Sequence, residues 1–167
     1  MKINVRTAEK ADTAKIAAIE KAVFPAEEAL PEETFEWCFA SFPEGFAVAE
    51  SAAADAGGAG GGEIAAAIVC RPTTLRLVTD DIYEKKEMSK GETFAIMTFV
   101  VAPHLQRKGL GDKMLEASLA LFREKGAKNF SLACKEHLKA FYGRHGFKAA
   151  GISRLTLGGA VWYDMYL

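Results

Sequence analysis

One stretch of the chain combines two glycines with two positive charges directly after a strand-like segment. Residues 103–111 read PHLQRKGLG, follow the apolar run 98–101, and lead into an amphipathic segment that begins near Asp112. A strand therefore leads through a glycine-containing turn into a helix. The first N–H groups of a helix have no partner inside it and carry the positive end of its dipole. Together with Arg107 and Lys108 they predict a site for phosphate or pyrophosphate.

The spacing of the glycines excludes two common phosphate-binding motifs. The P-loop string Gly-x-x-x-x-Gly-Lys-Ser/Thr does not occur in the sequence. The dinucleotide fingerprint Gly-x-Gly-x-x-Gly is missing too, because Met114 stands where its third glycine would be. The remaining pattern, Gln-x-x-Gly-x-Gly after a strand, is by itself equally compatible with a plain strand–helix turn that carries incidental charge.

The bulk properties are those of an ordinary globular protein. The chain has 167 residues, of which 50% are hydrophobic. This length predicts that residues 1–167 form a single domain with a substantial core. The net charge of -1 argues against a nucleic-acid partner. No apolar run is long enough to span a bilayer, and residues 1–6 lack the apolar core of a signal peptide. The three scattered cysteines suit a reducing compartment. We expect a cytoplasmic protein with no membrane partner.

Hydrophobic periodicity predicts the element order β-α-α-β-β-β-α-β-α-β-β, an α/β domain with a mixed sheet. The expected strands are residues 3–5, 45–50, 64–70, 94–101, 129–133, 147–149 and 161–167. The first expected helix starts at Thr7 or Asp12 and is ended by Pro25, and three further helices are expected at residues 32–40, 111–124 and 135–144. Residues 51–62 contain only Ser, Ala, Asp and Gly, which predicts a flexible hairpin loop. Residues 71–92 are expected to be irregular, as an active-site flap or an ordinary insertion.

A second stretch of the sequence carries a motif that complements the glycine turn. Residues 132–147 read LACKEHLKAFYGRHGF, which is a strand, a short helix with an aromatic pair, and Gly-Phe before another strand. With the glycine turn, this resembles the GNAT superfamily of N-acetyltransferases. The cysteine, the acid two residues later and the Phe-Tyr pair are similar to the arylalkylamine N-acetyltransferase family, particularly its bacterial and fungal branch. Residues 24–30 (FPAEEAL) and 158–165 (GGAVWYDM) support that branch.

The resemblance implies a GNAT fold with a mostly antiparallel central sheet flanked by helices, and an acetyl-CoA-dependent N-acetyltransferase. The enzyme would transfer acetyl directly to a small primary amine of arylalkylamine or polyamine type, without a metal, and either as a monomer or as a homodimer. The cofactor-binding residues that it implies are Phe99, Val100, Val101, Gln106, Arg107, Lys108, Gly109, Leu110, Gly111, Asp112 and Tyr142.

Direct acetyl transfer needs a proton acceptor and a proton donor. An alkylammonium has a pKa of ~10, so it must lose a proton before it can attack. The departing thiolate benefits from an acid near the sulfur, and Tyr142 matches the family's tyrosine, although a core aromatic would look the same. The histidines of vertebrate-type members are replaced by Ala95 and Met97. The resemblance to insect-type members makes Glu28 the best candidate base, although acids just past a helix end are most often solvated surface.

Other residues carry weaker signals. Glu27 is the next candidate base, and Thr98 could order a water. Cys134 invites an acetyl-cysteine intermediate, but a buried thiol is the simpler interpretation. His104 could touch phosphate, and the two acids Asp80 and Asp81 could meet a cationic substrate.

Two different functions remain open beside small-amine acetylation. One is a protein N-terminal or lysine acetyltransferase. The other is a catalytically silent acyl-CoA-binding module, which the loss of the strand histidines would explain. A zinc site is not expected, because the pair Cys134 and His137 has no second ligand pair.

Overall fold

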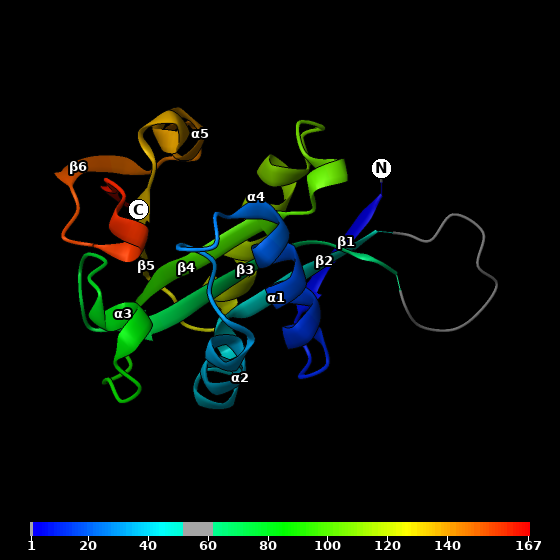
Figure 1. Cartoon of the computed structure of the whole chain (residues 1–167), viewed down its shortest axis with the longest axis horizontal. Helices are drawn as coiled ribbons and strands as arrows, with labels where there is room; N and C mark the ends of the chain where they lie inside the picture. The colour runs from blue at the N-terminus through cyan, green and yellow to red at the C-terminus, as the bar shows by residue number, and fades with distance from the viewer. Residues whose placement is uncertain (1, 52–61) are drawn as a thin grey trace. The chain divides into compact units, whose positions relative to one another are not determined.

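The computed structural model describes residues 2–51 and 62–167 (Figure 1). Its strands are β1 (Ile3–Thr7), β2 (Phe46–Ser51), β3 (Ile64–Thr73), β4 (Thr93–Val101), β5 (Asn129–Cys134), β6 (Lys148–Ile152) and β7 (Tyr163–Tyr166). The α-helices are α1 (Asp12–Val23), α2 (Glu32–Ser41), α3 (Asp81–Glu84), α4 (Leu110–Glu124) and α5 (Lys139–Arg144), and the short 3₁₀ turns are η1 (Pro43–Gly45), η2 (Pro103–Leu105), η3 (Glu136–Leu138) and η4 (Leu157–Gly159). The loop predicted at residues 51–62 falls almost wholly outside the described residues.

The strands form one mixed sheet in the order β1-β2-β3-β4-β5-β7-β6. The pairs β1–β2, β2–β3, β5–β7 and β6–β7 are antiparallel, whereas β4 and β5 are parallel. The predicted fold class, a mostly antiparallel mixed sheet flanked by helices, is therefore confirmed. The parallel pairs that join β4 to β5 run from Thr93–Asn129 to Ala95–Ser131, and β4 itself continues to Val101.

The prediction for residues 71–92 is partly wrong. The strand β3 continues to Thr73 with all its residues buried, and the short helix α3 follows. The guanidinium of Arg71, which is only 3% exposed, donates hydrogen bonds to the carbonyls of Ile82 at 2.8 Å and Lys86 at 3.3 Å. A donor from the neighbouring strand thus satisfies carbonyls at the end of α3, and the local sequence pattern gives no sign of it. The helix expected at residues 135–144 is instead η3 followed by α5.

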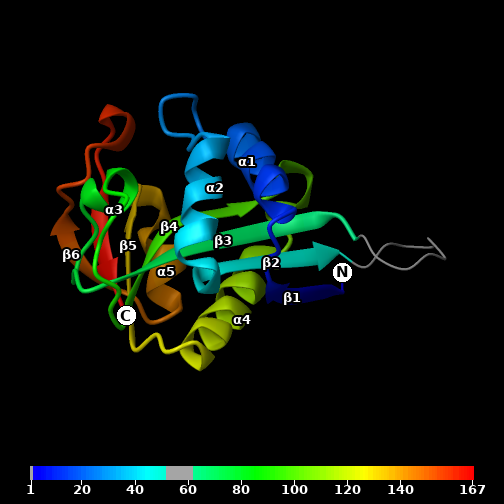
Figure 2. The same cartoon turned by 90° about the horizontal axis from the view of Figure 1, so that it is seen from below.

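The chain divides into two compact units. The first contains Met1–Val69 and Thr98–Leu121, and the second contains Cys70–Met97 and Phe122–Leu167. Within the first unit, α1 and α2 lie on one face of the strands β1–β3, and α4 lies on the other face (Figure 2). The single domain over residues 1–167 stays a prediction. No helix of the described residues is long and apolar enough to cross a membrane.

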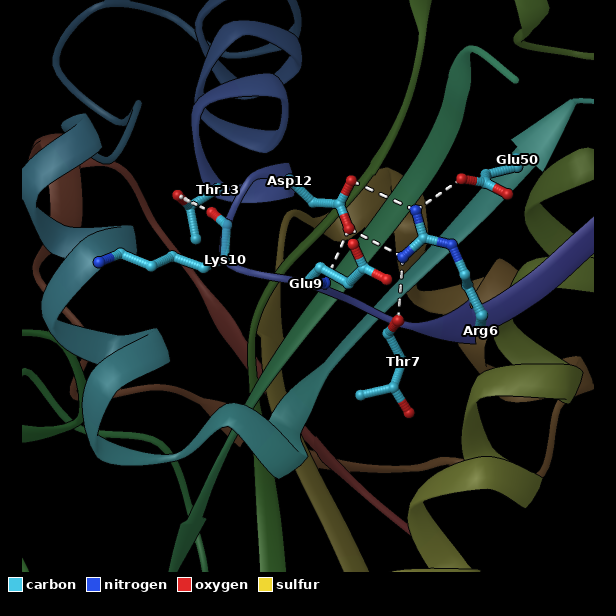
Figure 3. Close-up of polar contacts among 7 residues, drawn as sticks. All are labelled: Arg6, Thr7, Glu9, Lys10, Asp12, Thr13 and Glu50. Carbon is cyan, nitrogen blue, oxygen red and sulfur yellow. Dashed lines mark hydrogen bonds and ion pairs between the residues drawn. The ribbon is translucent and has the colours of Figure 1, made fainter. Parts of the chain in front are cut away.

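An ion network fixes the start of α1 in the first unit (Figure 3). The guanidinium of Arg6 lies 2.8 Å from an Asp12 carboxylate oxygen and 2.6 Å from a Glu50 oxygen. The Asp12 carboxylate also accepts the N–H of Glu9 at 2.8 Å. Because Asp12 is the first residue of α1, the network holds the helix at a defined place on β1 and β2, and with it every side chain that α1 presents to the sheet.

Candidate active site

The glycine turn lies between β4 and α4, as the sequence predicts. The backbone N–H of Ala102 donates to the carbonyl of Ala65 at 2.8 Å and fixes the end of β4. The side-chain amide of Gln106 donates to the carbonyl of Val101 at 3.1 Å, and the Lys108 ammonium donates to the carbonyl of His104 at 3.0 Å. The side chains of the turn therefore hold its own backbone in shape.

The backbone of this turn is strained at one position that is not glycine. Arg107 has φ 59° and Gly109 has φ 77°, both in the left-handed region. That region costs a residue with a side chain on the order of 1 kcal/mol, and such strain is concentrated at functional sites. Arg107, Lys108 and Gly109 are exposed, and α4 begins at the next residue. The first-turn N–H groups of residues 110 and 111 cannot be bonded within the helix, so the turn has the form of an anion site.

The last residues of β4 differ in exposure. Val100 is buried, with 1% of its surface exposed, whereas Phe99 and Val101 are half-buried. Residues 99–101 lie past the last parallel pair of β4 with β5, which is at Ala95. The backbone groups of such a strand segment can pair with a further extended chain.

Tyr142 lies on α5 in the second unit, among aromatic rings. Its ring centroid is 5.0 Å from that of Phe141 and 5.7 Å from that of Phe147, and the residue is 7% exposed. Burial raises the pKa of the Tyr142 phenol, and the nearby thiols of Cys134 and Cys70 raise it further. Within the described part of the chain, no hydrogen-bond partner of its hydroxyl is found. The phenol keeps its proton at neutral pH and can serve as a donor.

Cys134, at the end of β5, is a buried thiol. Burial raises its pKa to about 11, against an opposing effect of Lys139, and its Sγ lies 3.7 Å from the Sδ of Met165. A thiol with this pKa is almost wholly protonated at neutral pH and is a poor nucleophile. These properties favour direct transfer over an acetyl-cysteine intermediate.

Glu28 lies in the connection between α1 and α2 and is only 6% exposed. Its backbone N–H donates to the carbonyl of Pro25 at 2.9 Å, which closes a turn just past the end of α1. The neighbouring Glu27 is exposed. The structure therefore contradicts the alternative that Glu28 is solvated surface.

Sequence reasoning missed Glu20, the most deeply buried carboxyl of the first unit. Glu20 is 2% exposed, its Oε2 accepts the hydroxyl of Thr98 at 2.5 Å, and its Oε1 accepts the N–H of Leu30 at 3.3 Å. Burial raises the pKa of Glu20 to about 7, while these two hydrogen bonds lower it. A signal was present in the sequence, because Glu20 falls four residues after Ile16 in the apolar helical stripe of α1.

Two of the weaker candidates have structural partners. The carboxylate of Asp80 accepts the backbone N–H and the hydroxyl of Thr156, each at 2.8 Å. The exposed imidazole of His104 lies 3.3 Å from the Glu63 carboxylate. Among the described residues, no three His, Cys, Asp or Glu side chains are grouped so that they could hold a metal ion.

The structure brings the predicted residues together in two sets. Within the first unit, the glycine turn follows β4, and Thr98 of the same strand is joined to α1 through Glu20. Within the second unit, Tyr142 lies with Cys134 and Cys70. The first set holds a turn with the form of an anion site and a buried carboxyl, the second set holds a buried neutral phenol, and each is a group that acyl transfer can use.

Comparison with known families supports this chemistry. The acetyltransferase (GNAT) family profile matches residues 13–147, so the chain belongs to the acetyltransferase (GNAT) family. As a member of this family it is an N-acyltransferase of the acetyl-CoA-dependent type. Comparison with curated protein sequences gives no significant match.

Solved structures share the fold at low sequence identity. A chain of the NatC complex bound to Gag peptide and CoA is 16% identical, with a TM-score of 0.74 and coverage of 100% of this chain and 98% of the other. The ribosomal-protein-S18-alanine N-acetyltransferase from Escherichia coli is 19% identical, with a TM-score of 0.65 and coverage of 99% and 93%. A GNAT acetyltransferase from Brucella melitensis in complex with acetyl-CoA is 21% identical, with a TM-score of 0.59 and coverage of 89% and 84%. At these identities the likeness concerns the fold.

Proposed function

We propose that this chain transfers the acetyl group of acetyl-CoA directly to a small primary amine of arylalkylamine or polyamine type. One observation carries the proposal: the first unit buries the carboxyl of Glu20, which is 2% exposed and accepts hydrogen bonds from the neutral groups of Thr98 and Leu30. Buried carboxyls are rare unless they are paired or have a role. A cationic amine is the ligand whose charge and N–H groups match such carboxyls.

The residues of the glycine turn are proposed to hold the pyrophosphate of acetyl-CoA. The backbone N–H groups from Gln106 to Asp112 would face the anion, with Arg107 and Lys108 adding charge. The backbone of Val100 and Val101 would pair with the pantetheine arm in the manner of an added strand. Phe99 and Leu110 complete the proposed contacts on β4 and α4.

The proposed reaction proceeds without a covalent enzyme intermediate. Glu28 takes a proton from the bound ammonium, and the amine nitrogen then forms a C–N bond with the thioester carbon. The C–S bond breaks, and the departing sulfur takes a proton from the phenol of Tyr142. The amide nitrogen gives up its second proton and the Tyr142 phenolate takes a proton up, so that one proton is released per turnover. Holding both substrates in one site supplies roughly 7–11 kcal/mol of the barrier, and the proton transfers add to that effect.

The alternatives predict different substrates. Membership of the arylalkylamine branch rests on the motifs of residues 24–30 and 132–147. A protein N-terminal or lysine acetyltransferase would prefer peptides, and a silent acyl-CoA-binding module would turn over nothing. The buried, proton-bearing phenol of Tyr142 argues against the silent module, since packing alone needs no hydroxyl. A cytoplasmic location and a homodimer remain predictions.

The test is a substrate panel with thiol release as the readout. The panel contains arylethylamines, linear polyamines, and peptides with a free N-terminus or an internal lysine. An arylethyl alcohol of matched size serves as the control for uncoupled thioester hydrolysis. We expect the highest kcat/KM with one of the small amines. Turnover of peptides alone, or thiol release that is the same with the alcohol, would contradict the proposal.

A further inference from the structure

The buried carboxyl of Glu20 has only neutral partners. Its two oxygens accept one hydroxyl and one backbone N–H, from Thr98 and Leu30, and no cation contacts it within the part of the chain that the structure describes. A carboxylate in such surroundings is costly, because neutral donors replace only part of its hydration. Burial accordingly raises its pKa to about 7. The Glu20 carboxyl can therefore gain or lose a proton near neutral pH. A carboxyl with a purely structural role has no need of such a change in charge.

The direction of the Thr98 hydrogen bond determines what Thr98 can offer to a ligand. Its hydroxyl gives its single proton to Glu20 at an Oγ1–Oε2 distance of 2.5 Å. The hydroxyl oxygen therefore has only lone pairs left for another partner, and it can accept an N–H but cannot donate. An amine nitrogen is such a donor.

Thr98 lies on the part of β4 that the proposed function needs. It is three residues past the last parallel pair with β5, at Ala95, and two residues before Val100. In the proposed function, the backbone from Val100 onward receives the pantetheine arm. The hydroxyl of Thr98 thus belongs to the segment of β4 nearest in sequence to the bound acyl chain.

We infer that Glu20 and Thr98 form a proton relay that takes the proton lost by the amine nitrogen as the C–N bond forms. This inference rests on the proposed function. Thr98 touches the substrate, and Glu20 acts through Thr98 as the residue that holds the proton.

The proton balance of the relay is complete. As nitrogen attacks the thioester carbon, one N–H proton passes to Oγ1 of Thr98 while the Thr98 hydroxyl proton passes to Oε2 of Glu20. The C–S bond breaks, and the sulfur takes the phenol proton of Tyr142. Glu20 then returns its proton to solvent and the Tyr142 phenolate takes one up. With the proton that Glu28 removed from the ammonium, one proton is released per turnover.

The charged groups of the packed elements do not explain the behaviour of Glu20. Burial is the leading cause of its raised pKa, and the hydrogen bonds from Thr98 and Leu30 oppose it. None of the other charged or titratable groups on α1 and on the segments that follow or contact it is among the causes; these groups are Asp12, Lys15 and Lys21 on α1, Glu27 and Glu28 in the connection, Glu32, Glu33 and Glu36 on α2, and His104 on η2. The relay therefore titrates as a single buried carboxyl.

The kinetic test compares the pH dependence of turnover in matched variants at saturating amine and acetyl-CoA. Glu20→Gln keeps the shape and an acceptor for the Leu30 N–H, but it cannot take a proton. We expect kcat to fall about 10²–10⁴-fold and the rise of kcat around pH 7 to disappear. Raising the pH should not rescue this variant, because the proton is produced only after attack. Glu28→Gln, in contrast, should recover at high pH, where free amine is abundant.

Controls separate the relay from a structural role. Thr98→Val should show the same loss and Thr98→Ser should retain most of the activity, since serine keeps the hydroxyl. The exposed Glu36→Gln should behave as wild type. Melting temperature and acetyl-CoA affinity establish that each variant is folded, and the Thr98 pair keeps the inference testable if Glu20→Gln does not fold.

The outcomes are distinguishable. A wild type that acetylates none of the amines overturns the proposed function, and with it this inference. An active wild type, with Glu20→Gln at nearly wild-type kcat and an unchanged pH profile, overturns the inference alone. A second readout is independent of activity: the ¹³C signal of the Glu20 side-chain carboxyl, assigned by its loss in Glu20→Gln, should titrate near pH 7. Titration below pH 5 would overturn the relay.

Discussion

Tyr142 and Cys134 both lie in the second unit, and burial raises the pKa of each side chain. Their chemistry nevertheless differs. A buried thiol loses the thiolate form that makes it reactive, whereas a buried phenol keeps the proton that makes it a donor. At the scale of the residue, burial thus removes a nucleophile and preserves an acid, and both effects favour direct transfer.

Replacing Tyr142 by phenylalanine should remove the proton donor and keep the ring. We expect kcat to fall about 10²–10⁴-fold while the dissociation constant of acetyl-CoA, measured by calorimetry, stays near the wild-type value. The control is Tyr166→Phe on β7. The Cζ atom of Arg76 lies 5.4 Å from the centroid of the Tyr166 ring, and the variant keeps that ring. Full turnover of Tyr142→Phe, under conditions where chemistry limits the rate, would remove Tyr142 from the mechanism.

Glu28→Gln should lower kcat at neutral pH and recover part of it as the pH approaches 10. The reason is that Glu28, which removes the first proton of the ammonium, is needed only while the amine is protonated. The measurement is kcat across pH at saturating amine. An increase in KM alone would instead assign Glu28 to attraction of the cationic substrate, and a wild-type profile in both constants would exclude it from the reaction.

At the scale of the element, the start of a helix is set by groups outside it. The Arg6 network fixes the first residue of α1, and the turn at Gly109 fixes the first residue of α4. The two starts serve different purposes. The first places Glu20 within hydrogen-bond distance of Thr98 on β4, and the second leaves helix N–H groups available for an anion.

Gly109→Val should weaken acetyl-CoA binding about tenfold or more. Gly109 has φ 77°, and a Cβ at this position would have no atom within 4 Å. The free-energy cost of the substitution therefore comes from the backbone conformation rather than from a clash. A β-branched residue at this φ forces the turn to change. The matched control is Gly126→Val after the end of α4, where φ is 102° and the space is also open. The control should lower the melting temperature but leave the acetyl-CoA affinity of the folded protein unchanged.

Equal affinities in the two glycine variants would contradict the assignment of the turn to acetyl-CoA. Calorimetric titration of each variant with acetyl-CoA, at a temperature well below its melting point, gives the comparison.

At the scale of the whole molecule, two buried acids of the first unit have opposite effects on stability. Burial raises the pKa of Asp12, but the hydrogen bonds from Arg6 and Glu9 outweigh it, so that the net pKa lies below its ordinary value. Asp12 therefore stabilises the fold above its unfolded pKa, and this contribution is lost as the pH falls through the folded pKa. Glu20, with a raised pKa, has the reverse effect.

The free energy of unfolding should carry the signature of Glu20 between about pH 4.5 and 7. In this window the folded state holds a proton that the unfolded state releases, so stability falls as the pH rises. The shift from 4.5 to about 7 corresponds to at most roughly 3 kcal/mol. Urea unfolding across pH should show wild type losing this amount relative to Glu20→Gln, with no such change for Glu36→Gln. A constant difference between wild type and Glu20→Gln would contradict the raised pKa.

The sequence by itself determined the order in which strands and long helices follow one another along the chain, and the place of the glycine turn. Strong periodicity placed α4, and the Gln-x-x-Gly-x-Gly spacing placed the turn between β4 and α4. Both are local properties, since apolar spacing and backbone freedom act over a few residues. Tyr142 followed from its motif in the same way, although its role stays a prediction.

Only the tertiary structure decided which polar groups are buried and what they contact. The guanidinium of Arg71 on β3 donates hydrogen bonds to the carbonyl of Ile82 in α3 and to that of Lys86 just past its end. Glu20 meets Thr98 across 78 residues of sequence, and no local pattern encodes such a contact. Burial, hydrogen bonding and pKa are set by neighbours that are distant in the chain, so the pairing of Glu20 with Thr98 could be found only after the chain was folded.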